Sequence, residues 1–242
     1  MPATKRQPRE STKNSQRGAL APDRIAAILK ALDEAYPNVE CALIHRTPWE
    51  LLVATILSAQ CTDVRVNMVT PALFAAYPTA EALAEASQAD VEEIIRSTGF
   101  FRSKAQNLIG MAEGVVDRFG GEVPTGIEDL VSLPGVGRKT ANVVRSVAFD
   151  LPGLPVDTHV GRLARRLELV DETDPVKAEH ALNELIPASR RGVFSIRLIL
   201  HGRATCVARG PRCGTCPLSD LCPSSSRNVT IHRRPSRGGS PG

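Results

Sequence analysis

Aromatic residues, long apolar runs and alternating strand patterns are all scarce in this sequence. Phe, Trp and Tyr make up 4% of the 242 residues, and no stretch sustains the apolar and polar alternation of a half-buried strand. No apolar run approaches the roughly 18 to 20 residues that a membrane-spanning helix needs. The N-terminus also lacks the apolar segment of a secretory signal. These absences argue against a β-rich, membrane-spanning or secreted protein and predict a soluble, cytoplasmic one.

Acidic residues are missing from one long stretch, residues 190–219, which holds several arginines. Residues 1–20 hold five basic residues and one acid, and residues 227–242 hold four arginines and no acid. Because the net charge of the whole chain is only +4, the part between the two ends is net negative. This polarity is typical of a protein with one phosphate-facing side, although a solvated basic face gives the same pattern. We expect segments 1–21 and 225–242 to be disordered basic arms; the first also resembles an organellar transit peptide in composition.

Apolar residues recur at helical spacing along the chain, and 42% hydrophobic content is enough to build large cores. The first such stripe, in residues 23–35, is formed by Ile25, Ile28, Leu29 and Leu32. Residues that favour the N-cap position precede five further segments: Thr47, Ser87, Thr125, Asp157 and Asp174. The sequence therefore predicts an all-α fold.

Four of the six cysteines lie close together near the C-terminus, with the spacing Cys-x6-Cys-x2-Cys-x5-Cys: Cys206, Cys213, Cys216 and Cys222. Four thiolates in so short a span can converge on one metal centre, whereas disulfides would need an oxidising compartment. The spacing alone allows either an iron–sulfur cluster or a zinc ion. Cys41 and Cys61 lie far away in apolar surroundings, and we expect them to be small buried residues.

Residues 133–141, Leu-Pro-Gly-Val-Gly-Arg-Lys-Thr-Ala, follow one helical segment and open another. Gly135 and Gly137, on either side of Val136, permit a tight turn whose N–H groups point outward, and the helix N-terminus at Arg138 adds partial positive charge. Such a turn binds a backbone phosphate without reading base identity. Taken alone, Lys139 is either a further phosphate contact or a reactive amine.

The nonapeptide resembles the helix-hairpin-helix of the DNA glycosylase superfamily. Residues 156–160, Val-Asp-Thr-His-Val, resemble the motif that carries the catalytic aspartate of that superfamily, with Asp157 placed 18 residues after Lys139. The four cysteines match the iron–sulfur loop of its endonuclease III branch, and the similarity extends from about residue 22 to residue 222. This resemblance implies a [4Fe-4S] cluster, in place of zinc, at the four cysteines.

The resemblance implies a bifunctional DNA glycosylase and AP lyase of base excision repair that removes oxidised pyrimidines of the thymine glycol type. Lys139 as an amine would attack the sugar C1′, expel the base and form a Schiff base that permits β-elimination. The helix N-terminus and Arg138 both disfavour its ammonium form. Asp157 would stabilise the positive charge on the sugar or deprotonate Lys139, and it can cap the following helix at the same time.

Base excision requires the damaged nucleotide to leave the duplex, and other groups must fill the gap. The resemblance assigns this role to Gln60 and assigns pressure on the opposite strand to the loop around Phe100. Two phenylalanines stand in that loop where an aliphatic wedge often precedes an aromatic residue, and core packing is the alternative role for Phe100. We expect further DNA contacts from residues near the reaction site and in the cysteine loop: His159, Arg209 and Arg212.

The resemblance also implies two helical domains with a DNA cleft between them. A six-helix barrel would span residues 41–152, with the helix-hairpin-helix at about 124–150, and residues 22–40 plus 153–224 would form the iron–sulfur domain. The expected partner of this monomer is double-stranded DNA containing oxidised pyrimidines or abasic sites, on the nucleoid if the source is bacterial. Two alternatives remain open: a monofunctional adenine-type glycosylase, which typically lacks the lysine and carries a further C-terminal domain, and a non-catalytic helix-hairpin-helix module.

Overall fold

The computed structural model describes residues 22–226, which contain helices and loops but no strand. The α-helices in chain order are α1 (Pro22–Ala35), α2 (Pro48–Leu57), α3 (Asp63–Ala76), α4 (Ala80–Ala84), α5 (Gln88–Ile95), α6 (Phe101–Phe119), α7 (Ile127–Val131), α8 (Arg138–Ala148), α9 (Thr158–Arg166), α10 (Pro175–Leu185) and α11 (Arg191–Ala204). Short 3-10 helices span Arg96–Thr98, Ala188–Arg190, Cys213–Thr215 and Ser219–Leu221. None of the described helices is long and apolar enough to cross a membrane. The all-α prediction is confirmed.

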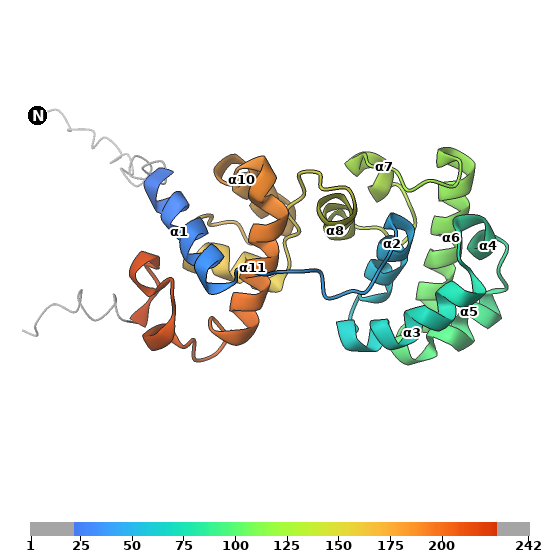
Figure 1. Ribbon diagram of the computed structural model, residues 1–242, viewed down its shortest axis with the longest axis horizontal. Helices are drawn as coiled ribbons and strands as arrows, with labels where there is room; N and C mark the ends of the chain where they lie inside the picture. The colour runs from blue at the N-terminus through green and yellow to red at the C-terminus, as the bar shows by residue number, and fades with distance from the viewer. Residues whose placement is uncertain (1–21, 227–242) are drawn as a thin grey trace, which may run out of the picture.

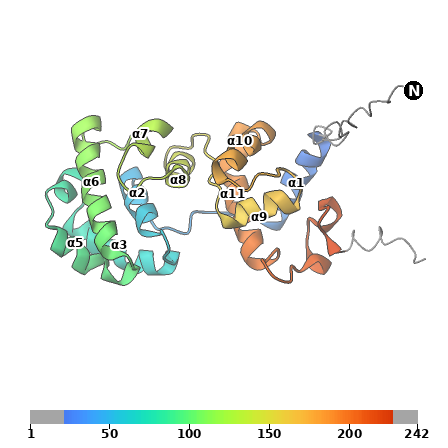
Figure 2. The ribbon, with the colours of Figure 1, turned by 180° about the vertical axis from the view of Figure 1, so that it is seen from behind.

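The helices form two halves, each with its own apolar core (Figure 1). Helices α2 to α8 make one half, whereas α1 joins α9, α10, α11 and the cysteine loop in the other. Figure 2 shows the same division from behind, with α9 beside α11. The chain therefore crosses from one half to the other between α1 and α2 and returns between α8 and α9. Residues 41–152 contain seven α-helices, of which α4 and α7 are short, with five residues each.

Helix α2 runs through the centre of its half, and every residue from Trp49 to Leu57 is buried. The Thr47 hydroxyl caps it by accepting the N–H of Glu50 at 3.1 Å, as predicted. The Glu50 carboxylate reaches back to the Arg46 N–H at 2.7 Å and also binds the Arg46 guanidinium. Burial by itself would raise the pKa of Glu50, but the hydrogen bonds from Arg46 outweigh it and hold that pKa below its ordinary value. The start of this helix is thus fixed by both a hydroxyl and a charge.

The other predicted helix starts give mixed results. Asp157 and Asp174 cap α9 and α10 with their side chains. Ser87 occupies the N-cap of α5 but forms no side-chain capping bond. The prediction for Thr125 is wrong: α7 has Gly126 as its extended N-cap, and the Thr125 carbonyl instead accepts a hydrogen bond from the Arg145 guanidinium. That tertiary contact fixes Thr125 one residue before the helix can start.

The predicted terminal arms lie almost wholly outside the described residues. Of the predicted C-terminal arm, the structure describes only Ser225 and Ser226, and Ser225 is buried, at 1% exposure, against the cysteine loop. The domain boundaries themselves stay predictions.

Candidate functional site

A pocket of about 290 Å³ lies between the two halves and is lined by both of them. Three predicted site residues line it together: Gln60, Lys139 and Asp157. Much of the remaining wall is apolar and comes from α8 and α11: Val143, Val147, Ile196, Ile199 and Leu200. A pocket of this size and mixed lining is suited to a small planar group held by a few polar contacts.

Lys139 stands in the first turn of α8, with its side chain exposed to the cleft. It also lines a neighbouring open pocket of about 550 Å³, together with Asp157, His159 and Arg203. Lys139 and Asp157 therefore lie on the shared rim of two adjoining pockets, although they belong to different halves. This brings together the amine and the carboxylate that the sequence analysis selected.

Asp157 is held rigidly at the start of α9. Its Oδ1 accepts the backbone N–H groups of His159 and Val160, both at 2.8 Å, while Oδ2 has no hydrogen-bond partner among the described residues. The segment before it is tied to α8 by Asn142, whose Oδ1 accepts the Leu154 N–H at 3.1 Å and whose Nδ2 donates to the Arg138 carbonyl at 3.1 Å. One carboxylate oxygen is thus used for capping and the other is left for chemistry.

The hairpin between α7 and α8 has the predicted glycine-dependent shape. Gly135 has φ of +72°, and a Cβ there would lie 2.8 Å from the side chain of Asn107 on α6. A Cβ on Gly137 would face open space. Val136 is buried, and its N–H already donates to the Leu133 carbonyl at 3.1 Å, so this residue anchors the turn and its amide is not free for a phosphate. No side chain caps α8, which leaves its first-turn N–H groups to meet an anion.

Arg138 is paired with a buried acid from the other half of the molecule. Its Nε donates to Oε2 of Glu179 on α10 at 2.9 Å, and the Glu179 side chain is only 5% exposed. This hydrogen bond raises the pKa of Arg138, so the guanidinium stays charged and paired. The ion pair with the buried Glu179 carboxylate therefore ties the hairpin to the other half of the molecule. The pair was invisible in the sequence because its members lie 41 residues apart.

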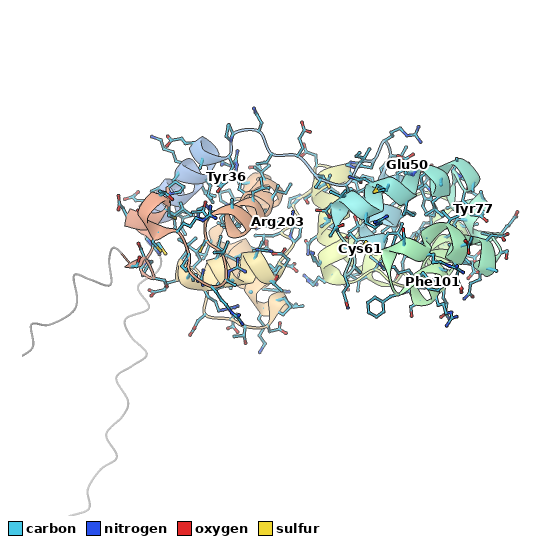
Figure 3. The ribbon with its side chains drawn as sticks, turned by 90° about the horizontal axis from the view of Figure 1, so that it is seen from below. Tyr36, Glu50, Cys61, Tyr77, Phe101 and Arg203 are labelled. Carbon is cyan, nitrogen blue, oxygen red and sulfur yellow. The ribbon has the colours of Figure 1, made fainter. Side chains whose placement is uncertain are left out.

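Gln60 and Phe100 both adopt left-handed backbone conformations, with φ of 52° and 49°. Both side chains are exposed, that of Phe100 by 67%, so the core-packing alternative for Phe100 is wrong. Phe101 is half-buried and lies beneath the guanidinium groups of Arg96 and Arg102. Figure 3 shows Cys61, next to Gln60, and Phe101, next to Phe100, in the same half of the molecule.

His159 is linked to α11 and to the cysteine loop through Arg162. Its Nδ1 accepts from Nη2 of Arg162 at 3.1 Å, and the same Nη2 donates to the carbonyls of Gly202 and Cys206, each at 3.0 Å. A Cβ on Gly202 would lie only 2.9 Å from His159 Nδ1, so glycine permits this close approach. Arg166 continues the pattern, with bonds to Val207 O at 2.8 Å and Cys206 Sγ at 3.2 Å. Arg162 and Arg166 thus hold the cysteine loop against α9 and α11.

The four clustered cysteines surround a second, small pocket. Within residues 22–226, no three His, Cys, Asp or Glu side chains are placed to hold a single metal ion. Four thiols around one cavity are the donor set that an iron–sulfur cluster needs. Burial raises the pKa of the Cys216 and Cys222 thiols, and the charges of the neighbouring cysteines raise it further. A cluster must displace these protons when it binds.

A buried histidine touches one of these cysteines. His201, 1% exposed, has Nε2 at 3.4 Å from Cys216 Sγ and Nδ1 at 2.9 Å from the Tyr36 hydroxyl. Burial lowers the pKa of His201. A neutral ring that donates from Nε2 to a cluster thiolate must accept from Tyr36 at Nδ1, so the two contacts specify one tautomer. By contrast, Cys41 and Cys61 are half-buried rather than fully buried.

Arg209 and Arg212 are exposed on the cysteine loop, and neither forms an ion pair in the described structure. A third arginine of the same acid-free stretch, Arg203, lies 3.5 Å from Asp63 across the cleft. Figure 3 places Arg203 on the opposite side of the cleft from Cys61. Sequence reasoning missed the pair of Arg203 and Asp63, because Asp63 carries only the signal of a helix start.

Comparisons with known proteins agree with this geometry. Residues 53–188 match the model of the HhH-GPD superfamily base excision DNA repair protein, and residues 206–222 match the iron-sulfur binding domain of endonuclease III. Endonuclease III of Synechocystis sp. is 55% identical over 203 residues, which cover 84% of this chain and 93% of the relative.

Two solved structures of endonuclease III with DNA, one a non-covalent complex and one a trapped covalent intermediate, are each 40% identical with a TM-score of 0.80. Each match covers 87% of this chain and 99% of the solved chain. The chain therefore belongs to the endonuclease III family, the iron–sulfur DNA glycosylases with AP lyase activity that act in base excision repair.

Proposed function

We propose that the protein removes oxidised pyrimidines from double-stranded DNA with Lys139 as the nucleophile and Asp157 as its carboxylate partner. The observation that carries this assignment is the convergence of Lys139, Asp157 and Gln60 on one pocket between the halves. The adenine-type alternative has less support, because an exposed lysine at the rim of the pocket provides the amine that a lyase needs. A non-catalytic module would not need a carboxylate oxygen left unpaired beside that amine.

The reaction follows from the two side chains. The flipped nucleotide enters the pocket, the unprotonated Nζ of Lys139 attacks the sugar C1′, and the bond from C1′ to the base breaks. The sugar ring then opens as the bond between C1′ and O4′ breaks, which leaves a Schiff base on C1′. The Schiff base acidifies the C2′ proton, and removal of that proton drives β-elimination, which breaks the bond between C3′ and the 3′ oxygen. Oδ2 of Asp157 accepts the proton from Lys139 or stabilises the positive charge on the sugar, while Oδ1 stays fixed in the helix cap.

The DNA contacts divide between the halves. The first-turn N–H groups of α8 and the exposed glycines of the hairpin bind a backbone phosphate near the lesion. Gln60 fills the space that the flipped nucleotide leaves, and Phe100 presses on the opposite strand. Arg209 and Arg212 meet phosphates from the cysteine loop, and His159 contributes a further contact beside Asp157.

Cys206, Cys213, Cys216 and Cys222 would hold the [4Fe-4S] cluster. When bound, the cluster would supply iron–thiolate bonds to all four cysteines and so stabilise the loop. Arg162 and Arg166 hold the same loop through its carbonyl groups and so connect it to the helix that begins at Asp157. The loop thereby presents its arginines at a fixed distance from the reaction site. We further propose that the protein acts as a monomer in the cytoplasm, on the nucleoid of a bacterial cell.

Borohydride trapping on DNA that contains thymine glycol or an abasic site tests the assignment. We expect the native protein to form a covalent adduct, and K139Q to form none while it still binds the DNA. An adduct that survives K139Q would show that another amine reacts, and a native protein that never traps would contradict the lyase mechanism. A parallel substrate with adenine opposite oxidised guanine tests the adenine-type alternative, for which we expect no excision.

A further inference from the structure

Lys104 on α6 is the only lysine among the buried polar residues of the described chain, with 5% exposure. Its Nζ donates to the Leu57 carbonyl at 2.8 Å and to the Thr98 carbonyl at 2.9 Å. Nothing in the reaction above uses this side chain. A buried charge whose hydrogen bonds all go to the ends of other segments calls for a reason, since an apolar residue of similar size would fill the same space.

The two carbonyls lie at the bases of the two loops that are proposed to enter the DNA. Leu57 is the last residue of α2 and lies three positions before Gln60. Thr98 ends the 3-10 helix and lies two positions before Phe100. The backbone N–H of Lys104 also donates to the Phe100 carbonyl at 3.0 Å. One side chain therefore joins the bases of both loops, which are 40 residues apart in the sequence.

Both loops contain backbone conformations that need such support. Gln60 and Phe100 have φ of 52° and 49°, and Gly99 has φ of +71°. Non-glycine residues in the left-handed region are strained and persist only where the surroundings enforce them. A donor shared by both loop bases limits how far either loop can relax alone.

The lysine is kept at a cost to stability. Burial lowers the pKa of Lys104, and the nearby Cys61 opposes this shift. A folded-state pKa below the unfolded value means that the folded chain binds this proton less tightly, so the charge costs stability at every pH below the ordinary lysine range.

We propose that Lys104 is a positioning residue that locks the Gln60 loop and the Phe100 loop into one unit, so that both enter the duplex together when the lesion flips out. This inference rests on the proposed roles of Gln60 and Phe100. Lysine suits the task because its compact ammonium offers three donors on a flexible stem and can bind two carbonyls from different segments. Figure 3 shows Cys61 and Phe101, which follow Gln60 and Phe100, on the half that α6 supports.

The variant K104M removes the donors while it keeps an unbranched side chain, and K104R restores a cation with several donors. We compare single-turnover excision of thymine glycol from duplex DNA with Schiff-base trapping on a single-stranded abasic oligonucleotide, which needs no duplex entry. We expect K104M to lose at least about tenfold more on the duplex than on the single strand, and K104R to recover part of that loss. Equal losses on both substrates would show a merely structural role and overturn the proposal, as would no loss on either.

A double-mutant cycle with Q60A and F100A provides the second measurement, which remains informative even if K104M is less stable. If Lys104 acts through the two loops, its substitution has little further effect on duplex excision once both inserting side chains are gone. A full, independent loss in that background would contradict the proposal. 2-Aminopurine opposite the lesion follows strand entry directly, and we expect K104M to slow its fluorescence change. A native protein that fails to trap on abasic DNA would instead refute the proposed function, which keeps the two failures distinct.

Discussion

The two halves of the molecule differ in the interactions that stabilise them. In the half built from α2 to α8, helix α2 is buried along nearly its full length and its neighbours pack an apolar core around it. In the other half, the loop from Cys206 to Cys222 contributes few buried apolar residues, with Leu218 the clearest case, and arginines bind its carbonyl groups. Packing thus positions Lys139, whereas polar contacts from Arg166 hold the cysteine loop, whose exposed arginines we propose to contact DNA.

The largest effect is expected where the halves meet, from D157N. Asparagine caps a helix as well as aspartate does, so the fold should tolerate the change, but the charge beside Lys139 is lost. We expect excision to fall by about 10² to 10³-fold while Tm changes by only a few degrees. Single-turnover kinetics and thermal melting check this. A large drop in Tm with little change in rate would show that Asp157 serves only as a cap.

Within the half built from α2 to α8, which we call the packed half, L52A should lower the free energy of unfolding more than any single change in the cysteine loop. Leu52 is 0% exposed at the centre of α2, and such truncations typically cost about 2 to 5 kcal/mol. Urea unfolding measures the change, and the absorbance of the iron–sulfur cluster should persist until the protein unfolds. Early bleaching of the cluster in the folded variant would mean that the two halves depend on each other more than their separate cores suggest.

In the half that contains the cysteine loop, R166Q should make the cluster easier to lose without unfolding the helices. Arg166 donates to three loop carbonyls and to Cys206 Sγ, so its loss exposes that edge of the cysteine site. We expect cluster loss in the presence of a chelator to be faster by roughly tenfold, the size that outer contacts of metal sites commonly show. R165Q on the same helix is the matched control, because within residues 22–226 Arg165 donates only to the Glu172 carbonyl. Equal bleaching rates for the two variants would contradict this account.

The smallest effect concerns the start of α2. The pKa of Glu50 is lowered in the folded state, so its carboxylate contributes stability above the unfolded pKa of about 4.3 and loses that contribution as the pH falls through the folded value. We expect E50Q to lower Tm by a few degrees at neutral pH and the difference from the native protein to shrink below about pH 4. A difference that stays constant down to acidic pH would show that the charge of Glu50 plays no part.

Local chemistry explains which features the sequence could predict. The caps at Thr47 and Asp157, the hairpin around Gly135 and the all-helical pattern each depend on a few adjacent residues, and the structure contains them. The pocket also brings together Lys139, Asp157 and Gln60, whose roles stay proposals.

What the sequence could not predict depends on residues that meet only in the fold. The pairing of Arg138 with Glu179 redirects a side chain that looked available for DNA. The buried position of Lys104 contradicts the usual exposed place of lysine, and no local pattern marks it. At Thr125 the local sequence predicts an N-cap, but a contact between its carbonyl and Arg145 places the start of the helix one residue later.

The central claim is that an amine from the packed half reacts beside a carboxylate from the other half. The most direct test is to trap the native holoprotein with borohydride on abasic DNA, digest the adduct and locate the modified residue by mass spectrometry. The account predicts that the sugar remnant is attached to Lys139, with the buried Lys104 and the exposed Lys177 unmodified. Attachment to any other amine, in the folded protein with its cluster intact, would contradict it.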